Sequence, residues 1–389
     1  MEPEAVVTDR GAARVRGGHP WVYRSDVTEA NGEPGDVTRV LDRRGRFLGR
    51  AFLNPRSEIS LRIAERSDVP VDEAWFRARI REALAYRETL GIDAGAYRLL
   101  HAEADGVPGL VVDYYGDYVV LQAGSAAVER RLDLVVDALR ELISPSGILL
   151  RADSAGRRRE GLDSETRILH GEVPESVVVR EGLVCYRAFL WSGQKTGGFL
   201  DQRENHQAAG RHAVGAGRAL DVFSYAGGFA LHLARNAGSV EVMDASGPAL
   251  EMARANAELN GFENLAFTRA NAFDVLRERS DVGERYDTVV LDPPAFAKAK
   301  RDLPKARRAY KEINLRAMKL LAPGGTLITC SCSHHLSREM FEDVLRSAAA
   351  DAGAAMRVRE WRGQAQDHPE LLTVPETRYL KCAVLERAR

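Results

Sequence analysis

The sequence predicts an α/β fold for the C-terminal half of the chain, because short apolar runs alternate there with helix-like stretches. The length of 389 residues is a second observation and predicts two or three domains. The third observation is that the first 190 residues lack this regular alternation of strands and helices. We therefore expect a small β-barrel over residues 1–70, an α+β domain over residues 71–190, and the α/β domain over residues 191–389.

The N-terminal 190 residues contain two kinds of local signal. Turn signals such as Asn31-Gly32 and Arg44-Gly45 separate short strand candidates, and no long helical period appears before residue 70. Asp72 is then a suitable N-cap for a helix that runs to about Leu90. A second helix is expected at residues 127–142. The expected strands cover residues 37–41, 47–52, 59–63, 109–113, 118–122, 148–152 and 176–179.

The C-terminal region contains seven strand candidates with helices between them. Ligands bind at the carboxyl ends of the strands in open α/β sheets, so polar residues that follow these strands are the candidate site. The strands are expected at residues 218–223, 240–244, 266–269, 287–291, 325–329, 356–361 and 379–385, and the helices at residues 227–237, 247–260, 305–321 and 337–351.

Composition excludes several classes of protein. No apolar run approaches the ~18 residues that span a bilayer, and the start lacks a signal-peptide pattern. Four cysteines in so long a chain do not form a disulfide framework, so we expect a cytoplasmic protein.

The net charge of −1 gives no global attraction for polyanions. Residues 295–316 nevertheless hold 8 basic and 2 acidic residues, which is either a solvated face or a set of phosphate contacts.

A cofactor site is indicated where the first strand of the α/β domain leads into a glycine-containing turn, Asp221-Val-Phe-Ser-Tyr-Ala-Gly227-Gly228. The next strand ends in Asp244, which is placed to accept hydrogen bonds from ribose hydroxyls, and the third leads to Asn271. The turn matches neither the dinucleotide fingerprint nor a phosphate loop, so S-adenosylmethionine fits better than a pyrophosphate cofactor. An ordinary structural turn remains the alternative.

A reactive site is indicated by two further strand ends, Leu291-Asp292-Pro293-Pro294-Ala295-Phe296 and Thr329-Cys330-Ser331-Cys332-Ser333. Cytosine carbon 5 is a poor nucleophile, but attack of a thiolate on carbon 6 makes it reactive. Cys332 lies nearer the expected site, whereas Cys330, Cys185 and Cys382 are expected in the core. A metal site is not expected, since no second Cys pair accompanies these cysteines.

Other residues are given roles around this thiol. Asp292 is expected to hydrogen-bond the ring nitrogen of the base, while Pro293 forms a stiff wall and Phe296 stacks on the base. Glu376 is the candidate base for the carbon 5 proton, with His334 and His335 as rivals. Residues 193–205 add Lys195 and Arg203, which are suited to phosphate or to the methionine carboxylate; a capped helix start is the alternative there.

These segments together resemble the bacterial ribosomal RNA large subunit methyltransferase I family, the class I S-adenosylmethionine-dependent enzymes that make 5-methylcytosine in RNA. The resemblance implies an N-terminal PUA domain, a central α+β domain, and a Rossmann-like, seven-stranded methyltransferase domain whose last strand is antiparallel. It also implies Cys332 as the nucleophile and 23S ribosomal RNA as the partner. The cofactor-binding positions it implies are Asp221, Phe223, Ser224, Tyr225, Ala226, Gly227, Gly228, Asp244, Ala245, Asn271, Ala272 and Asp292.

Some alternatives stay open at this point. Asn271 stands where many class I enzymes have Asp, which leaves the adenine contact open. Methylation of a guanine or adenine nitrogen uses similar Asp-Pro-Pro turns and needs no thiolate. A non-catalytic RNA-binding assembly factor is the other rival. The sequence does not choose between a monomer and a homodimer, and it does not identify the modified cytosine.

Overall fold

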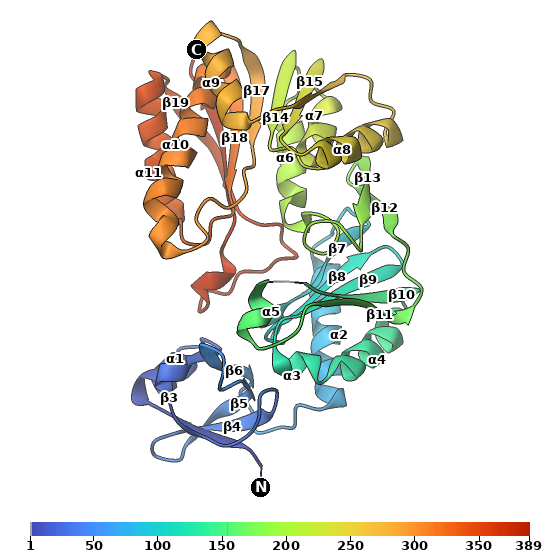
Figure 1. The fold of residues 1–389 in the computed structure, drawn as a ribbon, viewed down its shortest axis with the longest axis vertical. Helices are drawn as coiled ribbons and strands as arrows, with labels where there is room; N and C mark the ends of the chain where they lie inside the picture. Colours follow the sequence, from blue (N-terminus) through green and yellow to red (C-terminus); the bar gives the residue numbers. More distant parts are fainter. Residues whose placement is uncertain (1, 154) are drawn as a thin grey trace. The chain divides into compact units, whose positions relative to one another are not determined.

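The computed structural model of the chain describes residues 2–153 and 155–389 (Figure 1). The chain forms two compact units. Unit 1 contains Met1–Val179, Ala188–Leu200 and Gln366–Thr377, and unit 2 contains Arg180–Arg187, Asp201–Ala365 and Arg378–Arg389. Among the described residues, no helix combines the length and the apolar character needed to span a bilayer.

The N-terminal part of unit 1 is a six-stranded sheet in the order β2-β6-β5-β4-β1-β3. Its apolar side chains, such as Val22, Val40 and Leu61, form a separate core cluster. A short helix, α1, was not expected there; the Thr8 side chain caps it by accepting a hydrogen bond from the Gly11 amide. The elements are β1 (Glu4–Val7), α1 (Asp9–Arg16), β2 (Trp21–Tyr23), the 3₁₀ turn Arg24–Asp26, β3 (Val27–Ala30), β4 (Val37–Asp42), β5 (Phe47–Leu53) and β6 (Ile59–Glu65).

The second sheet of unit 1 has five strands in the order β11-β10-β9-β8-β7. The helix expected at residues 127–142 is divided in two, because the backbone of Arg131 leaves the helical region. Strand β7 was not expected, since the charged Arg98 interrupts its apolar pattern; the Asp113 carboxylate neutralises that buried guanidinium at 2.8 Å. The elements are α2 (Glu73–Thr89), β7 (Ala96–His101), the 3₁₀ turn Ala102–Asp105, β8 (Leu110–Tyr115), β9 (Tyr118–Ala123), α3 (Ala126–Glu129), α4 (Leu132–Ile143), β10 (Gly147–Ala152), α5 (Ala155–Arg159) and β11 (Glu165–Gly171).

Unit 2 is built on a seven-stranded sheet in the order β16-β15-β14-β17-β18-β20-β19. Strands β14, β15, β16, β17 and β18 pair in parallel, and β20 pairs antiparallel with both β18 and β19. The expected seven strands and the antiparallel last strand are therefore confirmed. The strands are β14 (Arg218–Val222), β15 (Ser239–Asp244), β16 (Leu265–Arg269), β17 (Tyr286–Leu291), β18 (Leu321–Ser331), β19 (Met356–Arg362) and β20 (Lys381–Arg387), and a separate hairpin joins β12 (Ser176–Glu181) to β13 (Val184–Phe189).

Helices cover both faces of this sheet (Figure 1). One core cluster joins the sheet to α9, α10 and α11, and another joins it to α6, α7 and α8. Helix α9 was not expected, because its polar sequence has only one fully buried apolar side chain, Leu276. The helices are α6 (Arg203–His212), α7 (Gly228–Ala234), α8 (Gly247–Leu259), α9 (Ala272–Val282), α10 (Leu303–Leu320) and α11 (Arg338–Ala352), with 3₁₀ turns at Leu200–Gln202, Lys300–Asp302 and Pro375–Thr377.

The strand order fixes where a ligand can bind in unit 2. The chain leaves β14 toward β15 on one side, and β17 adds to β14 on the other side. In open α/β sheets such a reversal opens a crevice at the carboxyl ends of the two central strands. The residues that follow β14 and β17 are the glycine-containing turn and the Asp-Pro-Pro turn, so both candidate segments lie at this crevice.

Candidate active site

The turn between β14 and α7 holds an unusual backbone conformation. Phe223 and Tyr225 have φ angles of 64° and 47°, and Gly227 has a φ of 86°. Non-glycine residues rarely adopt positive φ, and such strain concentrates at ligand-binding sites. The Ser224 amide donates to the Met243 carbonyl at 3.1 Å, which fixes the turn against the end of β15.

Asp221 lies buried beneath this turn, with only part of its hydrogen-bonding capacity used. Its Oδ2 accepts from the Ala230 amide at 3.0 Å, whereas Oδ1 is buried without a partner among the described residues. Burial, followed by the negative charge of Asp292, raises the pKa of Asp221 to about 7. The hydroxyl oxygen of Ser224 is likewise buried and unpaired among the described residues. Two unsatisfied oxygens in one turn suit a ligand that brings hydrogen-bond donors.

Asp244 ends β15 and faces the same turn. One carboxylate oxygen accepts from the Tyr225 amide at 3.0 Å and the other from the Ser246 amide at 2.8 Å. Each oxygen keeps further acceptor capacity, as ribose hydroxyls require. Asn271 is exposed and caps α9 by accepting from the Phe273 amide at 2.9 Å, which commits its side-chain carbonyl to the helix. Its amide nitrogen can still donate to an adenine edge.

A buried ionic cluster supports the turn from below. Glu181 Oε1 lies 2.8 Å from His206 Nδ1 and 3.0 Å from His232 Nε2. The His206 ring lies directly under Gly228, where a Cβ atom would come within 2.6 Å of the ring. Gly228 therefore has to be glycine for a steric reason. The cluster was not predicted, because no sequence motif joins residues 25 and 51 positions apart.

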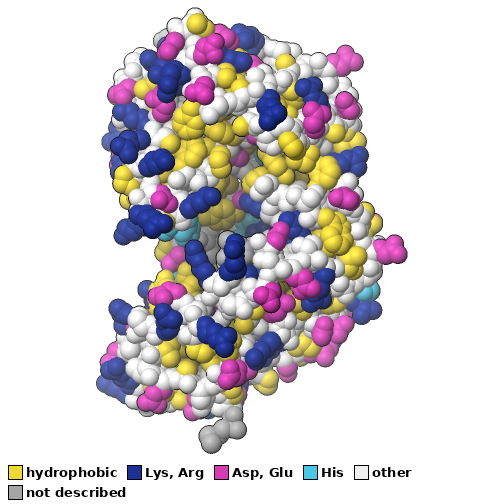
Figure 2. All heavy atoms as spheres, in the orientation of Figure 1, with side chains coloured by type: hydrophobic (Ala, Val, Ile, Leu, Met, Phe, Trp, Pro, Cys, Tyr) yellow, Lys and Arg dark blue, Asp and Glu magenta, His cyan; other side chains and the backbone are white. Residues whose placement is uncertain are grey.

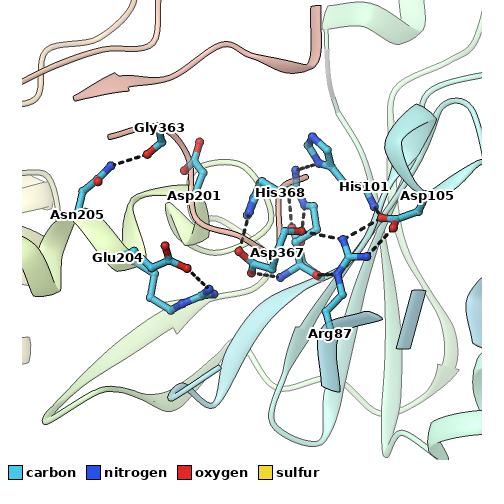
Figure 3. Close-up of polar contacts among 12 residues, drawn as sticks. Arg87, His101, Asp105, Asp201, Glu204, Asn205, Gly363, Asp367 and His368 are labelled. Carbon is cyan, nitrogen blue, oxygen red and sulfur yellow. Dashed lines mark hydrogen bonds and ion pairs between the residues drawn. The ribbon is translucent and has the colours of Figure 1, made fainter. Parts of the chain in front are cut away.

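The Asp-Pro-Pro turn follows β17 and brings Asp292 to the crevice. Gln202 Nε2 donates to Asp292 Oδ1 at 2.9 Å, and Asn205 Nδ2 donates to Gln202 Oε1 at 2.7 Å. Asn205 Nδ2 also donates to the Gly363 carbonyl at 3.0 Å (Figure 3). Gln202 was missed, although residues 193–205 were singled out for Lys195 and Arg203. The presence of an amide side chain among the cations of that segment is the sequence signal that could have identified Gln202.

The two cysteines at the end of β18 have different surroundings. Cys330 is fully buried in the core beside Cys382, and burial raises the pKa of its thiol. Cys332 follows the last strand residue, is half-buried, and places Sγ 4.0 Å from the Pro293 carbonyl oxygen. The strand ends at Ser331, so the alternation of the strand does not set the direction of Cys332. The structure thus brings Cys332 to the Asp-Pro-Pro turn and leaves Cys330 in the core.

Phe296 and Pro293, the residues predicted to contact the RNA base, pack partly against the protein itself. Phe296 lies between Tyr310 and Phe273, with ring centroids 4.7 and 5.9 Å away. Pro293 is buried, whereas Pro294 is exposed. Of the two prolines, Pro294 therefore offers the more accessible surface for a base.

Arg203 and Lys195 belong to different units. Arg203 begins α6 in unit 2 and is almost fully buried beside Glu204. Lys195 belongs to unit 1, is exposed, and places Nζ 4.8 Å from the centroid of the Phe199 ring. His334 and His335 are exposed in unit 2 just after Cys332.

Glu376 lies in a segment of unit 1 that is anchored by buried ionic contacts. Its Oε2 is 3.1 Å from His19 Nε2. Earlier in the segment, the Asp367 carbonyl accepts from Arg87 Nη2 at 2.7 Å, and the same guanidinium contacts Asp105 (Figure 3). The segment that carries Glu376 is therefore held to unit 1 by several contacts.

Comparison with known proteins identifies the family. A model of PUA-like domains matches residues 6–66, and a model of S-adenosylmethionine-dependent methyltransferases matches residues 151–371. The ribosomal RNA large subunit methyltransferase I of Aeromonas salmonicida is 42% identical over 381 residues, covering 95% of this chain and 96% of the relative. The protein of the same name from Vibrio cholerae (classical strain) is 40% identical over 399 residues, covering 99% and 100%.

A solved structure has the same fold. It is described as a proposed methyltransferase in complex with SAH, superposes with a TM-score of 0.86 at 21% identity, and covers 99% of this chain and 100% of its own. The predicted PUA-like domain and S-adenosylmethionine-dependent methyltransferase fold are thereby confirmed. This chain belongs to the ribosomal RNA large subunit methyltransferase I family.

Proposed function

We propose that this protein acts in the cytoplasm and transfers a methyl group to carbon 5 of a cytosine in 23S ribosomal RNA through a covalent adduct with Cys332. Its relatives are named as methyltransferases of large-subunit ribosomal RNA, which supports the substrate class. The observation that supports cytosine carbon 5 as the acceptor is the position of Cys332, whose Sγ lies 4.0 Å from the Pro293 carbonyl oxygen in the Asp-Pro-Pro turn. A nitrogen-methylating enzyme needs the turn but has no use for a thiol beside it.

The glycine-containing turn and the ends of β15 and β16 fit S-adenosylmethionine. The buried oxygens of Asp221 and Ser224 are acceptors for its ammonium group, and Asp244 is an acceptor for its ribose hydroxyls. Asn271 and Ala272 lie at the start of α9, where the adenine edge is expected. When bound, S-adenosylmethionine supplies a methyl group on a positively charged sulfur, ready for attack by a carbon nucleophile.

The remaining chemistry comes from residues of this chain. The Cys332 thiolate forms a bond to carbon 6 of the cytosine, and the ring electrons shift so that carbon 5 becomes the nucleophile. In its protonated form Asp292 donates a hydrogen bond to the ring nitrogen on which negative charge develops, and Gln202 fixes the direction of its carboxyl group. After methyl transfer a base removes the carbon 5 proton, the carbon–sulfur bond breaks, and the thiolate is restored. Glu376 is the proposed base, with His334 and His335 as alternatives.

Cationic and stacking side chains are proposed to hold the RNA. Lys195 is exposed for phosphate, and Arg203 is nearly buried, which suits the methionine carboxylate better than a flexible RNA strand. Pro293 is buried and is proposed to stiffen the turn, while Phe296 and the exposed Pro294 form the wall beside the flipped base. Figure 2 shows Lys and Arg side chains gathered along the flank formed by α10 and α11. The exposed cations that precede and begin α10 are Lys298, Lys300, Arg301, Lys305, Arg307 and Arg308.

The decisive test is a covalent trap. RNA that carries 5-fluorocytosine cannot lose the substituent at carbon 5, so the proposed mechanism leaves the enzyme bound to it after denaturation. Wild-type protein and Cys330→Ala should give this adduct in gels, whereas Cys332→Ala should give none and should not methylate normal RNA. Cys330→Ala is the matched control because it also removes a thiol, two residues before Cys332 in the sequence.

Other outcomes identify the rivals. Methylation that survives in Cys332→Ala would favour a nitrogen acceptor, and mass spectrometry of the digested RNA would locate the methyl group. Absence of S-adenosylmethionine binding by calorimetry would favour an assembly factor. If Glu376→Gln releases methylated RNA at the wild-type rate, Glu376 is not the base.

A further inference from the structure

Lys381 is a buried cation beside the proposed nucleophile. It is the first residue of β20 and pairs with Ser331 of β18. Only 5% of the residue is exposed. Its Nζ donates to the Ser333 and Tyr379 carbonyl oxygens, each at 2.8 Å.

The partners of Lys381 leave its charge uncompensated. Both acceptors are neutral carbonyl groups, and among the described residues no carboxylate is a hydrogen-bond partner of Nζ. An ammonium group has three N–H donors, and the two carbonyls use two of them. A buried charge without a counter-charge is costly, so proteins retain one where it meets an anion in function.

The available counter-charge is the Cys332 thiolate. Burial lowers the pKa of Lys381 to about 8, and the negative charge of Cys332 opposes this shift. Lys381 holds the carbonyl of Ser333, the residue that follows Cys332. Because Nζ is bound to the residue after Cys332 and Lys381 is paired in the sheet with the residue before it, the amine lies next to the thiol.

We propose that Lys381 is the positioning residue that activates Cys332 by forming an ammonium–thiolate pair with it. Sγ releases its proton to solvent, and the Lys381 ammonium stabilises the thiolate until carbon 6 is attacked. When the carbon–sulfur bond later breaks, the thiolate returns to the same ammonium. This inference rests on the proposed role of Cys332 as the nucleophile.

Other groups near Cys332 do not offer a positive charge in the same place. Tyr310 on α10 contributes a phenol whose pKa is raised by burial, so it stays neutral. Asp292 in the turn is a carboxyl group and supplies no positive charge. His334 and His335 follow Cys332 but are exposed to solvent. Of the groups named here, Lys381 is therefore the one that brings a buried positive charge next to Cys332.

The test measures the thiol without requiring methyl transfer. The rate of Cys332 alkylation by iodoacetamide is followed against pH by mass spectrometry of its peptide, in wild type, Lys381→Met and Lys381→Arg. The wild-type thiol should titrate below the ordinary value of about 8.5. Lys381→Met should slow alkylation at pH 7 about tenfold. Lys381→Arg should preserve most of the rate, because the guanidinium keeps the charge.

Lys319→Met is the control, since this lysine lies in the last turn of α10 and belongs to no proposed site. An unchanged alkylation profile in folded Lys381→Met overturns the inference. If Lys381→Met does not fold, the wild-type profile decides: a thiol that titrates at or above about 8.5 overturns the inference by itself. Failure of the proposed function has a different signature, namely methylation that persists in Cys332→Ala.

Discussion

Replacement of Gly228 by alanine tests whether the glycine-containing turn depends on the buried ionic cluster of Glu181, His206 and His232 beneath it. The added Cβ would lie 2.6 Å from Cε1 and 2.7 Å from Nε2 of His206. The backbone of Gly228 does not have positive φ, so the conflict is purely steric. The His206 ring cannot turn aside freely, because Nδ1 is bound to Glu181 at 2.8 Å and the ring packs in a T-shaped contact with Phe229, with 4.6 Å between the ring centroids.

The expected cost follows from these contacts. Overpacking a tight core site costs about 1–3 kcal/mol, and displacing the ring adds the partial loss of a charge-assisted hydrogen bond. Gly228→Ala should therefore lower the free energy of unfolding by about 3 kcal/mol. It should also weaken S-adenosylmethionine binding at least tenfold, because the strained turn ends directly before this residue.

Gly247 provides a matched control. It is the first residue of α8, as Gly228 is of α7, but its Cβ would meet nothing closer than 3.6 Å. Gly247→Ala should be neutral or slightly stabilising by up to about 1 kcal/mol. The measurements are urea unfolding and calorimetry with the cofactor. Equal stability of the two variants would refute the reasoning, and so would a double variant with His206→Ala that recovers nothing.

Two further predictions concern buried carboxylates. Glu181→Gln should lower the free energy of unfolding at pH 7 by about 3 kcal/mol, because it leaves the two histidines without their anion, whereas exposed Glu251→Gln should have almost no effect. Burial opposes ionisation of Glu181, but His206 and His232 lower its pKa to about 2, so this contribution is present above pH 4.5 and is lost as the pH falls through 2. Asp221 behaves oppositely: with its pKa raised to about 7, the folded protein holds a proton that the unfolded chain releases, and stability falls as the pH rises from 4 to 7. Asp221→Asn should remove that slope, at most about 4 kcal/mol, and urea unfolding at pH 5 and pH 8 would contradict the prediction if the slope persisted.

Much of unit 2 was predictable because its signals are local. Each parallel strand is a short apolar run that is followed by a polar residue, and glycines mark the ends of the helices between strands. The seven strands of the sheet could therefore be predicted from the sequence. The Asp-Pro-Pro turn and the glycine-containing turn are chemically distinctive within a few residues. Elements that depend on distant partners were missed: β7 needs Asp113 to neutralise Arg98, and α9 has little apolar pattern of its own.

The sequence by itself determined the fold class and predicted S-adenosylmethionine as the cofactor, since both depend on contiguous segments, and it predicted Cys332 rather than Cys330 as the nucleophile. Only the tertiary structure decided what surrounds them. The antiparallel pairing of β20 with β18 puts Lys381 beside the end of the strand that leads to Cys332, and the packing of α6 under α7 puts His206 beneath Gly228. The physical reason is that buried charges find their partners through the order of strands and the packing of helices, which connect residues far apart in the chain.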